Sequence, residues 1–148
     1  MTSDSILIEV AGVADDELRE AMARLVPELA TDPPPTAHQL REIVDSSCTM
    51  LLLARDTSQS RRIVGMLALT IFRIPTGVRA WIDDVAVEPA SRGRGVGARL
   101  TQAAIDRAAE RGARIVDLTS RPMREAANRL YLRLGFEIRD TNVYRRRL

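Results

Sequence analysis

The chain has 148 residues, of which 45% are hydrophobic and 28% charged, a composition typical of one folded domain rather than a disordered chain. Its net charge of +2 is too small to indicate a nucleic-acid partner, and its apolar runs are too short to predict a membrane span. One cysteine and one histidine exclude an internal disulfide and a Cys/His metal cluster, and the 22 basic residues are all arginine, which excludes lysine nucleophiles.

The N-terminal part alternates short strand and helix patterns. Residues 5–10 alternate apolar and polar side chains, which predicts a short strand. Asp15 or Asp16 is placed to cap a following helix, and three consecutive prolines at 33–35 end that region. Thr36 begins a second, shorter helix. Because no basic region and apolar stretch open the sequence, no secretory signal is expected, and a cytoplasmic location is the default prediction.

Three strand patterns follow one another in the middle of the chain. Residues 48–54 form an apolar run, and residues 63–74 form a long run rich in β-branched residues. Residues 55–62 are polar and predict the turn between them, while Pro75 and Gly77 predict the next turn. A strand at residues 81–87 then completes a predicted antiparallel meander.

The C-terminal part changes to helical spacing. Residues 97–111 predict a helix and residues 114–118 a strand. A further helix is expected to start near Pro122 and to end at Gly135, because proline is tolerated in a first turn and glycine closes helices. From Phe136 onward we expect a final strand or hairpin. This order of elements predicts an α/β or α+β fold with helices on both faces of a sheet.

A glycine-rich turn joins the third strand of the meander to the long helix. Residues 92–97 have the sequence Arg-Gly-Arg-Gly-Val-Gly, and backbone N–H groups converge there at a helix N-terminus, which favours an anion. Glycine permits positive φ and close approach to phosphate oxygens, and Arg92 and Arg94 add positive charge. The turn therefore predicts a phosphate site, with a solvated surface turn as the simpler alternative.

The same turn also fits a dinucleotide-binding pattern. Together with Ala98 it satisfies G-x-G-x-x-A, and Asp117 follows at about the spacing of a ribose-binding acid. Two observations count against this hypothesis. Residues 88–91 intervene between the strand and the glycines, and only one clear βαβ unit follows in this short chain. We therefore rank a nicotinamide dinucleotide below the following interpretation.

Two segments resemble the GNAT superfamily of N-acetyltransferases. The acyl-CoA loop of that family has the pattern Q/R-x-x-G-x-G/A, which Arg92, Gly95 and Gly97 match. Its other hallmark is a helix carrying asparagine and then tyrosine before a Gly-Phe turn, and residues 127–136 match it. The resemblance covers the C-terminal half strongly, whereas the N-terminal half agrees in its order of elements.

The resemblance implies a GNAT-like domain over residues 1–148, with a mixed, mainly antiparallel sheet between helices. It also implies transfer of an acetyl group from acetyl-CoA to an amine by direct attack in a ternary complex, without a metal. The pantetheine arm is expected to insert between residues 85–87 and 114–118. The residues expected to bind acetyl-CoA are Val85, Ala86, Val87, Arg92, Gly93, Arg94, Gly95, Val96, Gly97, Asn128 and Tyr131.

The side chains expected at the reaction centre suit acyl transfer. Asn128 and Tyr131 lie three residues apart and share a helix face, so an amide and a phenol can meet one ligand. The phenol is a candidate acid for the leaving thiolate. An acceptor ammonium must lose a proton to a carboxylate, for which Asp83, Asp84 and Glu88 are candidates, and similarity to relatives favours the two aspartates. Strand alternation places these two on opposite faces, so one faces the site unless a bulge intervenes.

The acceptor is not identified by any pattern, and a small-molecule or peptide amine is expected. Five acidic residues of the N-terminal part are candidates for attracting a cationic amine, although solvated charges are the simpler interpretation: Glu17, Glu20, Glu28, Asp32 and Glu42. A homodimer is an expectation from the family. The competing functions are a non-catalytic acyl-CoA-binding module and a dinucleotide-binding protein. Neither a nucleic acid nor a membrane is expected as a partner of the chain.

Overall fold

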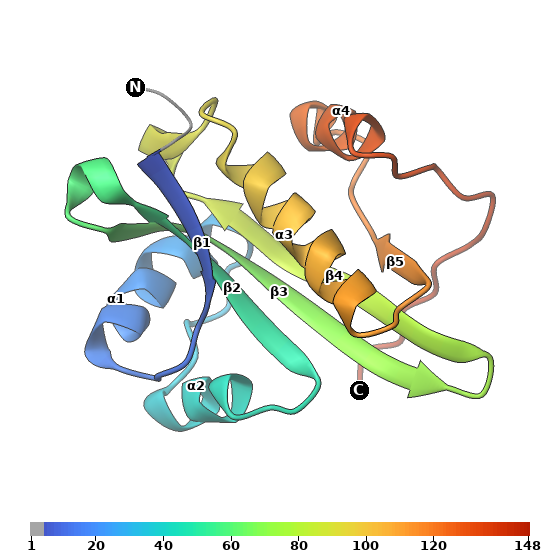
Figure 1. Cartoon of the computed structure of the whole chain (residues 1–148), viewed down its shortest axis with the longest axis horizontal. Coiled ribbons are helices and arrows are strands. Elements are labelled where there is room, and N and C mark those ends of the chain that lie inside the picture. The colour runs from blue at the N-terminus through green and yellow to red at the C-terminus, as the bar shows by residue number, and fades with distance from the viewer. Residues whose placement is uncertain (1–4) are drawn as a thin grey trace.

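A computed structural model describes residues 5–148, which form a five-stranded sheet in the order β1-β2-β3-β4-β5 (Figure 1). Four neighbouring strands are antiparallel, and β5 is parallel to β4. The strands are β1 (Ile6–Val10), β2 (Thr49–Asp56), β3 (Arg62–Ile74), β4 (Gly77–Val87) and β5 (Ile115–Leu118). This mixed, mainly antiparallel sheet confirms the predicted fold class and meander.

Helices cover both faces of the sheet. The helices α1 (Asp16–Leu25) and α2 (Ala37–Val44) lie on one face, and α3 (Val96–Glu110) crosses the other (Figure 1). The last helix, α4 (Glu125–Arg133), lies near the N-terminal end of α3. Among residues 5–148, no helix combines the length and the apolar composition that a membrane crossing requires.

The apolar run in β2 explains why helices pack on both sides. Leu51 and Leu53 belong to the cluster formed with α1 and α2, whereas Leu52 and Ala54 belong to the cluster under α3. Successive side chains of a strand point to opposite faces, so a continuous apolar run is buried only when both faces are covered. The sequence of β2 therefore requires a three-layer arrangement.

Two helix starts follow the predicted caps. The Asp15 carboxylate accepts a hydrogen bond from Leu18 N at 2.9 Å. Thr36 and Gln39 form a capping box, in which each side chain accepts from the backbone N–H of the other residue. These bonds satisfy N–H groups that the first helical turn leaves without partners, and they confirm the predicted starts of α1 and α2.

The C-terminal end differs from the prediction. The helix α4 begins at Glu125 rather than at Pro122, which lies in the preceding turn. The predicted strand or hairpin from Phe136 onward is wrong, because residues 136–148 form no strand and loop out past β5 (Figure 1). The apolar residues Ile138 and Val143 stand five positions apart and are exposed, so the segment lacks the alternation that a half-buried strand needs.

Gly65 on β3 allows α3 to approach the sheet closely. A Cβ at this position would lie 3.1 Å from Val96 Cγ1 and 3.2 Å from Leu100 Cδ1, both on α3. It would also lie 3.2 Å from the carbonyl oxygen of Ala86, a backbone atom that has little freedom to move. The missing side chain of Gly65 therefore fixes the distance between the sheet and the first turns of α3.

Gly65→Val should destabilise the protein by about 2 kcal/mol, because an enlarged side chain overpacks the contact with α3. Denaturant unfolding followed by circular dichroism measures this change. Gly12→Val is the matched control, since nothing lies within 4 Å of a Cβ at Gly12. Equal stabilities of the two variants would contradict the proposed contact.

Candidate active site

The turn before α3 presents free backbone donors. Gly93 and Gly95 adopt φ values of 75° and 77°, a region in which glycine is strongly preferred. Gly95 is the N-cap of α3, a helix of 15 residues whose dipole is positive at this end. Among residues 5–148, the N–H groups of residues 93–98 donate no hydrogen bond, so they are available to an anion.

The two sequence motifs meet at Gly97. A Cβ on Gly97 would lie 3.4 Å from Leu130 Cδ2, so the first turn of α3 packs directly against α4. The helix that carries Asn128 and Tyr131 is thereby held beside the glycine turn (Figure 1). Residues that are more than 30 positions apart in sequence therefore border one region of the surface.

The two arginines of the turn have different environments. Arg92 is exposed and its Nη2 lies 2.8 Å from the Glu28 carboxylate. Arg94 is directed inward, where its Nη1 donates to Asp56 at 2.7 Å and its Nη2 donates to Ser5 Oγ at 3.0 Å. Arg94 was predicted to offer its positive charge to a phosphate. In this structure that charge is neutralised by the buried carboxylate of Asp56.

Asp56, which pairs with Arg94, was not among the predicted site residues. Its side chain is fully buried, and the hydrogen bond from Arg94 holds the pKa of the carboxyl well below its usual range, with further bonds from Ser58 and Gln59 acting in the same direction. The local signal was the Asp-Thr-Ser sequence after an apolar strand, which is typical of a side chain that caps a turn. Its link to Arg94 has no local signal.

The second half of β4 has an open edge on the side of β5. Residues 79–82 pair with β5, whereas residues 83–87 do not, and of these Asp83, Ala86 and Val87 pair with β3 on the opposite edge. The chain leaves β5 after Leu118 and forms the turn that precedes α4. The backbone groups of residues 83–87 on this edge therefore have no neighbouring strand. The opening begins at Asp83, where the pairing of β4 with β5 has ended, and β5 itself stays paired along its whole length.

A β-bulge lies where this opening begins. Ala68 pairs with Asp83 and Met66 with Ala86, so β4 has one more residue than β3 in this interval. Asp84 has a φ of 51°, which is unusual for a residue with a side chain. Because of this bulge, strand alternation no longer forces Asp83 and Asp84 onto opposite faces, so both can reach one region.

The bulge reverses the alternation of β4. Ile82 packs in the cluster under α3, and without a bulge Ala86 would face the same side. Instead Ala86 belongs to the cluster under α1 and α2, while Val85 and Val87 pack against the α3 cluster. The three residues predicted to line the cofactor are thus anchored on both faces and leave their backbone edge open.

The three candidate bases differ in their partners. Glu88 is bound by Arg24 at 2.6 Å and by Arg62 at 2.9 Å. Burial acts to raise the pKa of Glu88, but the hydrogen bonds from both arginines outweigh it and lower the pKa. Within the described residues neither Asp83 nor Asp84 forms an ion pair, and burial together with the charge of Asp83 raises the pKa of Asp84. Glu88 therefore stabilises the fold, whereas the two aspartates remain open to a ligand.

Tyr131 and Asn128 also have distinct surroundings. The Tyr131 ring is buried and packs edge-on against Phe136, with centroids 5.8 Å apart. Burial raises the pKa of the Tyr131 phenol, and the positive charge of Arg124 lowers it by less, so the hydroxyl stays protonated at neutral pH. Asn128 donates its side-chain NH₂ to the carbonyl oxygen of Arg121 at 2.9 Å, which leaves mainly its amide oxygen for a ligand.

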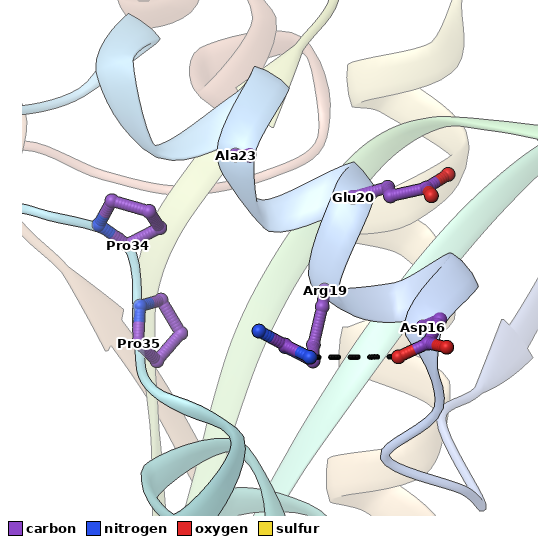
Figure 2. Close-up of a pocket in the computed structure, with 6 residues that line it drawn as sticks. All are labelled: Asp16, Arg19, Glu20, Ala23, Pro34 and Pro35. Carbon is purple, nitrogen blue, oxygen red and sulfur yellow. Dashed lines mark hydrogen bonds and ion pairs between the residues drawn. The ribbon is translucent and has the colours of Figure 1, made fainter.

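A surface hollow of about 390 Å³ lies elsewhere, between α1 and the proline segment (Figure 2). Its lining residues are Asp16, Arg19, Glu20, Ala23, Pro34 and Pro35. Arg19 turns toward Asp16 at 3.5 Å, and both side chains are largely exposed. Of the residues predicted to bind acetyl-CoA or to act in the reaction, none lines this hollow, although Glu20, a candidate for attracting the amine, does; we therefore place the candidate site at β4 and α3 instead.

Solved structures share this fold along nearly the whole chain. An aminoglycoside acetyltransferase from an uncultured soil metagenomic sample has a TM-score of 0.81 at 18% identity, covering 98% of this chain and 97% of that chain. A Trypanosoma brucei acetyltransferase has a TM-score of 0.76 at 24% identity, covering 95% and 99%. A transcriptional regulator from Bacillus halodurans has a TM-score of 0.74 at 29% identity, with the same two coverages.

Sequence comparison gives the family. An uncharacterised N-acetyltransferase of Methanocaldococcus jannaschii is 43% identical over 61 residues, which are 41% of this chain and 27% of that protein. The matched region thus spans about a quarter of the relative. The model of the acetyltransferase (GNAT) family matches residues 16–136, which include the sheet from β2 to β5, the glycine turn and the Asn128–Tyr131 helix. The chain therefore belongs to the GNAT family of acetyltransferases.

Proposed function

We propose that the chain transfers an acetyl group from acetyl-CoA to the nitrogen of an amine. The observation that carries this proposal is the open edge of β4 at residues 83–87, which leads directly to the free N–H groups before α3. A ligand with a peptide-like arm and a pyrophosphate suits this combination, because backbone groups bind the arm and a helix N-terminus binds the phosphates.

The residues around the opening supply the binding groups that acetyl-CoA needs. The N–H groups of residues 93–97 serve the pyrophosphate, and Arg92 is exposed and able to exchange Glu28 for a phosphate oxygen. The backbone of residues 85–87 and the amide oxygen of Asn128 serve the pantetheine arm. Glycine at positions 93 and 95 keeps side chains away from this path.

The reaction needs one base, one acid and one donor for the developing negative charge. Asp84 takes a proton from the acceptor ammonium, and the neutral nitrogen forms a bond to the thioester carbon as the carbon–sulfur bond breaks. Tyr131 donates its proton to the departing sulfur, and the acylated nitrogen gives up its second proton to the phenolate, which restores Tyr131. A backbone N–H of residues 85–87 stabilises the charge that develops on the carbonyl oxygen. Acetyl-CoA supplies the activated acyl group, and no covalent enzyme adduct is required.

The acceptor is proposed to be a cationic small-molecule or peptide amine. Glu17 and Glu28 each pair with an arginine, which weakens their attraction for such a cation. Asp83 and Asp84 lie without ion pairs among residues 5–148 and give the mouth of the opening a negative charge. A cytoplasmic location and a homodimer remain predictions.

Thermal unfolding with acetyl-CoA, CoA and NAD tests the ligand. Acetyl-CoA or CoA at about 100 times its Kd should raise Tm by several degrees, since a ligand that binds the folded state contributes about 2.7 kcal/mol. NAD is the control and should leave Tm unchanged. A shift with NAD alone would contradict the proposal and favour the dinucleotide-binding alternative.

Tyr131→Phe should lower kcat by about 100-fold and leave the Kd of CoA nearly unchanged, because it removes the acid but keeps the ring that packs against Phe136. Steady-state kinetics and calorimetric titration measure the two quantities. Tyr144→Phe, at an exposed tyrosine, is the control and should behave as the wild type. An undiminished kcat in Tyr131→Phe would remove the acid role from this residue. CoA binding by the wild type without turnover of any amine would instead favour a binding-only module.

The pH dependence distinguishes the two aspartates. A base must be ionised, so activity falls as pH drops through the raised pKa of Asp84. Asp83→Asn removes the neighbouring negative charge, which should move this acidic limb of kcat/KM to lower pH. Asp84→Asn should lower kcat/KM about 100-fold at neutral pH. If the larger loss occurs in Asp83→Asn instead, Asp83 is the base.

A further inference from the structure

We propose that Asp56 is a positioning residue for acyl-CoA binding, because its buried carboxylate holds Arg94 and, through Arg94, the glycine turn of residues 92–97. This inference rests on the proposed function, which assigns the pyrophosphate to that turn. Asp56 is the last residue of β2 and stands 38 positions before Arg94, so the ion pair joins the β2–β3 hairpin to the start of α3.

The Asp56 carboxylate is itself held firmly. It accepts from Ser58 N at 3.0 Å, from Ser58 Oγ at 2.6 Å and from Gln59 Nε2 at 2.6 Å, besides the bond from Arg94 at 2.7 Å. Asp56 is 0% exposed, so neither water nor a phosphate competes for these bonds. The end of the β2–β3 hairpin is therefore held rigidly, and the bond from Arg94 to Asp56 restrains the glycine turn.

Arg94 connects the Asp56 carboxylate to the glycine turn. It stands between Gly93 and Gly95, both at positive φ, and glycine loses more conformational freedom on ordering than any other residue. Without an anchor, a turn with glycine on both sides of one residue would sample many conformations, and ligand binding would have to order it. The Asp56–Arg94 pair orders the turn during folding, which lowers the entropy cost of binding.

Arg92 provides the contrast within the same turn. Its side chain is 56% exposed and pairs with a partly exposed glutamate, whereas the Arg94 side chain is 19% exposed and pairs with a fully buried aspartate. Withdrawing Arg94 from Asp56 would leave an uncompensated buried charge, which is strongly unfavourable. We therefore assign phosphate contact to Arg92 and positioning of the turn to Arg94 and Asp56.

Asp56→Asn tests the proposal, since asparagine keeps the acceptor oxygen for Ser58 but replaces the oxygen that accepts from Arg94 and Gln59 with an uncharged NH₂ donor. The Kd of CoA from calorimetric titration should rise about tenfold as preorganisation is lost. With acetyl-CoA at saturation, kcat for the same amine should stay within about twofold of wild type, because the reacting groups are untouched. Trypsin should cleave after Arg94 faster in the unliganded variant.

Two further variants separate positioning from loss of stability. Arg55→Gln removes a similarly buried arginine that pairs with Glu9 and Glu17 on the side of α1, so it should lower Tm while the Kd of CoA stays at the wild-type value. The double variant Asp56→Asn with Arg94→Met removes both charges of the pair. Its Tm should recover from that of Asp56→Asn, but the Kd should stay raised.

The outcomes distinguish the two levels of the hypothesis. A wild-type Kd in Asp56→Asn, or recovery of the Kd together with Tm in the double variant, would overturn the positioning role. Failure of the wild-type protein to bind CoA would overturn the proposed function instead. In that case the rate of trypsin cleavage after Arg94 still decides whether Asp56 holds the turn.

Discussion

The separation of β4 from β5 beyond Ile82 is the constraint on which the site depends. The short β5 pairs with the first half of β4, and the chain then turns away toward α4, so one edge of residues 83–87 has no strand beside it. An edge with unpaired N–H and C=O groups is open to an added extended chain, whether a ligand arm or another protein. The bulge at Asp84 lies where this edge begins and sets the orientation of the residues along it.

The charges around this opening fall into two groups. Glu88, Asp56 and Arg94 are paired and largely buried, so their charges hold α1, the β2–β3 hairpin and the glycine turn in place. Asp83, Asp84 and the N–H groups before α3 have no protein partners among residues 5–148, so they remain for ligands. The anion-binding end and the acidic mouth of the opening thus carry opposite polarity, as suits a phosphate-bearing donor and a cationic acceptor.

The close contacts of two glycines connect this local chemistry to the fold. Gly65 brings α3 down onto β3, and Gly97 brings α4 against the first turn of α3. At Gly65 the missing Cβ determines the distance between the two elements, whereas at Gly97 the approach of Leu130 is an ordinary van der Waals contact. The helix carrying Tyr131 is therefore held beside the glycine turn through Leu130, and among residues 5–148 no hydrogen bond joins the two motifs.

Much of the fold and of the candidate site was predictable from local patterns. The caps at Asp15 and Thr36, the meander and the glycine turn at the start of α3 depend on residues that are neighbours in sequence, and their predictions were confirmed. The expected strand after Phe136 was wrong because short apolar patterns form strands only beside an available partner.

The sequence by itself determined the family, through two motifs whose chemistry is local, and it named both aspartates without choosing between them. Tertiary structure decided that β4 carries a bulge, that Glu88 is occupied by Arg24 and Arg62, and that Arg94 faces Asp56. The physical reason is that pairing across the sheet and burial of charge depend on residues distant in sequence, and no spacing along the chain encodes which of them will meet.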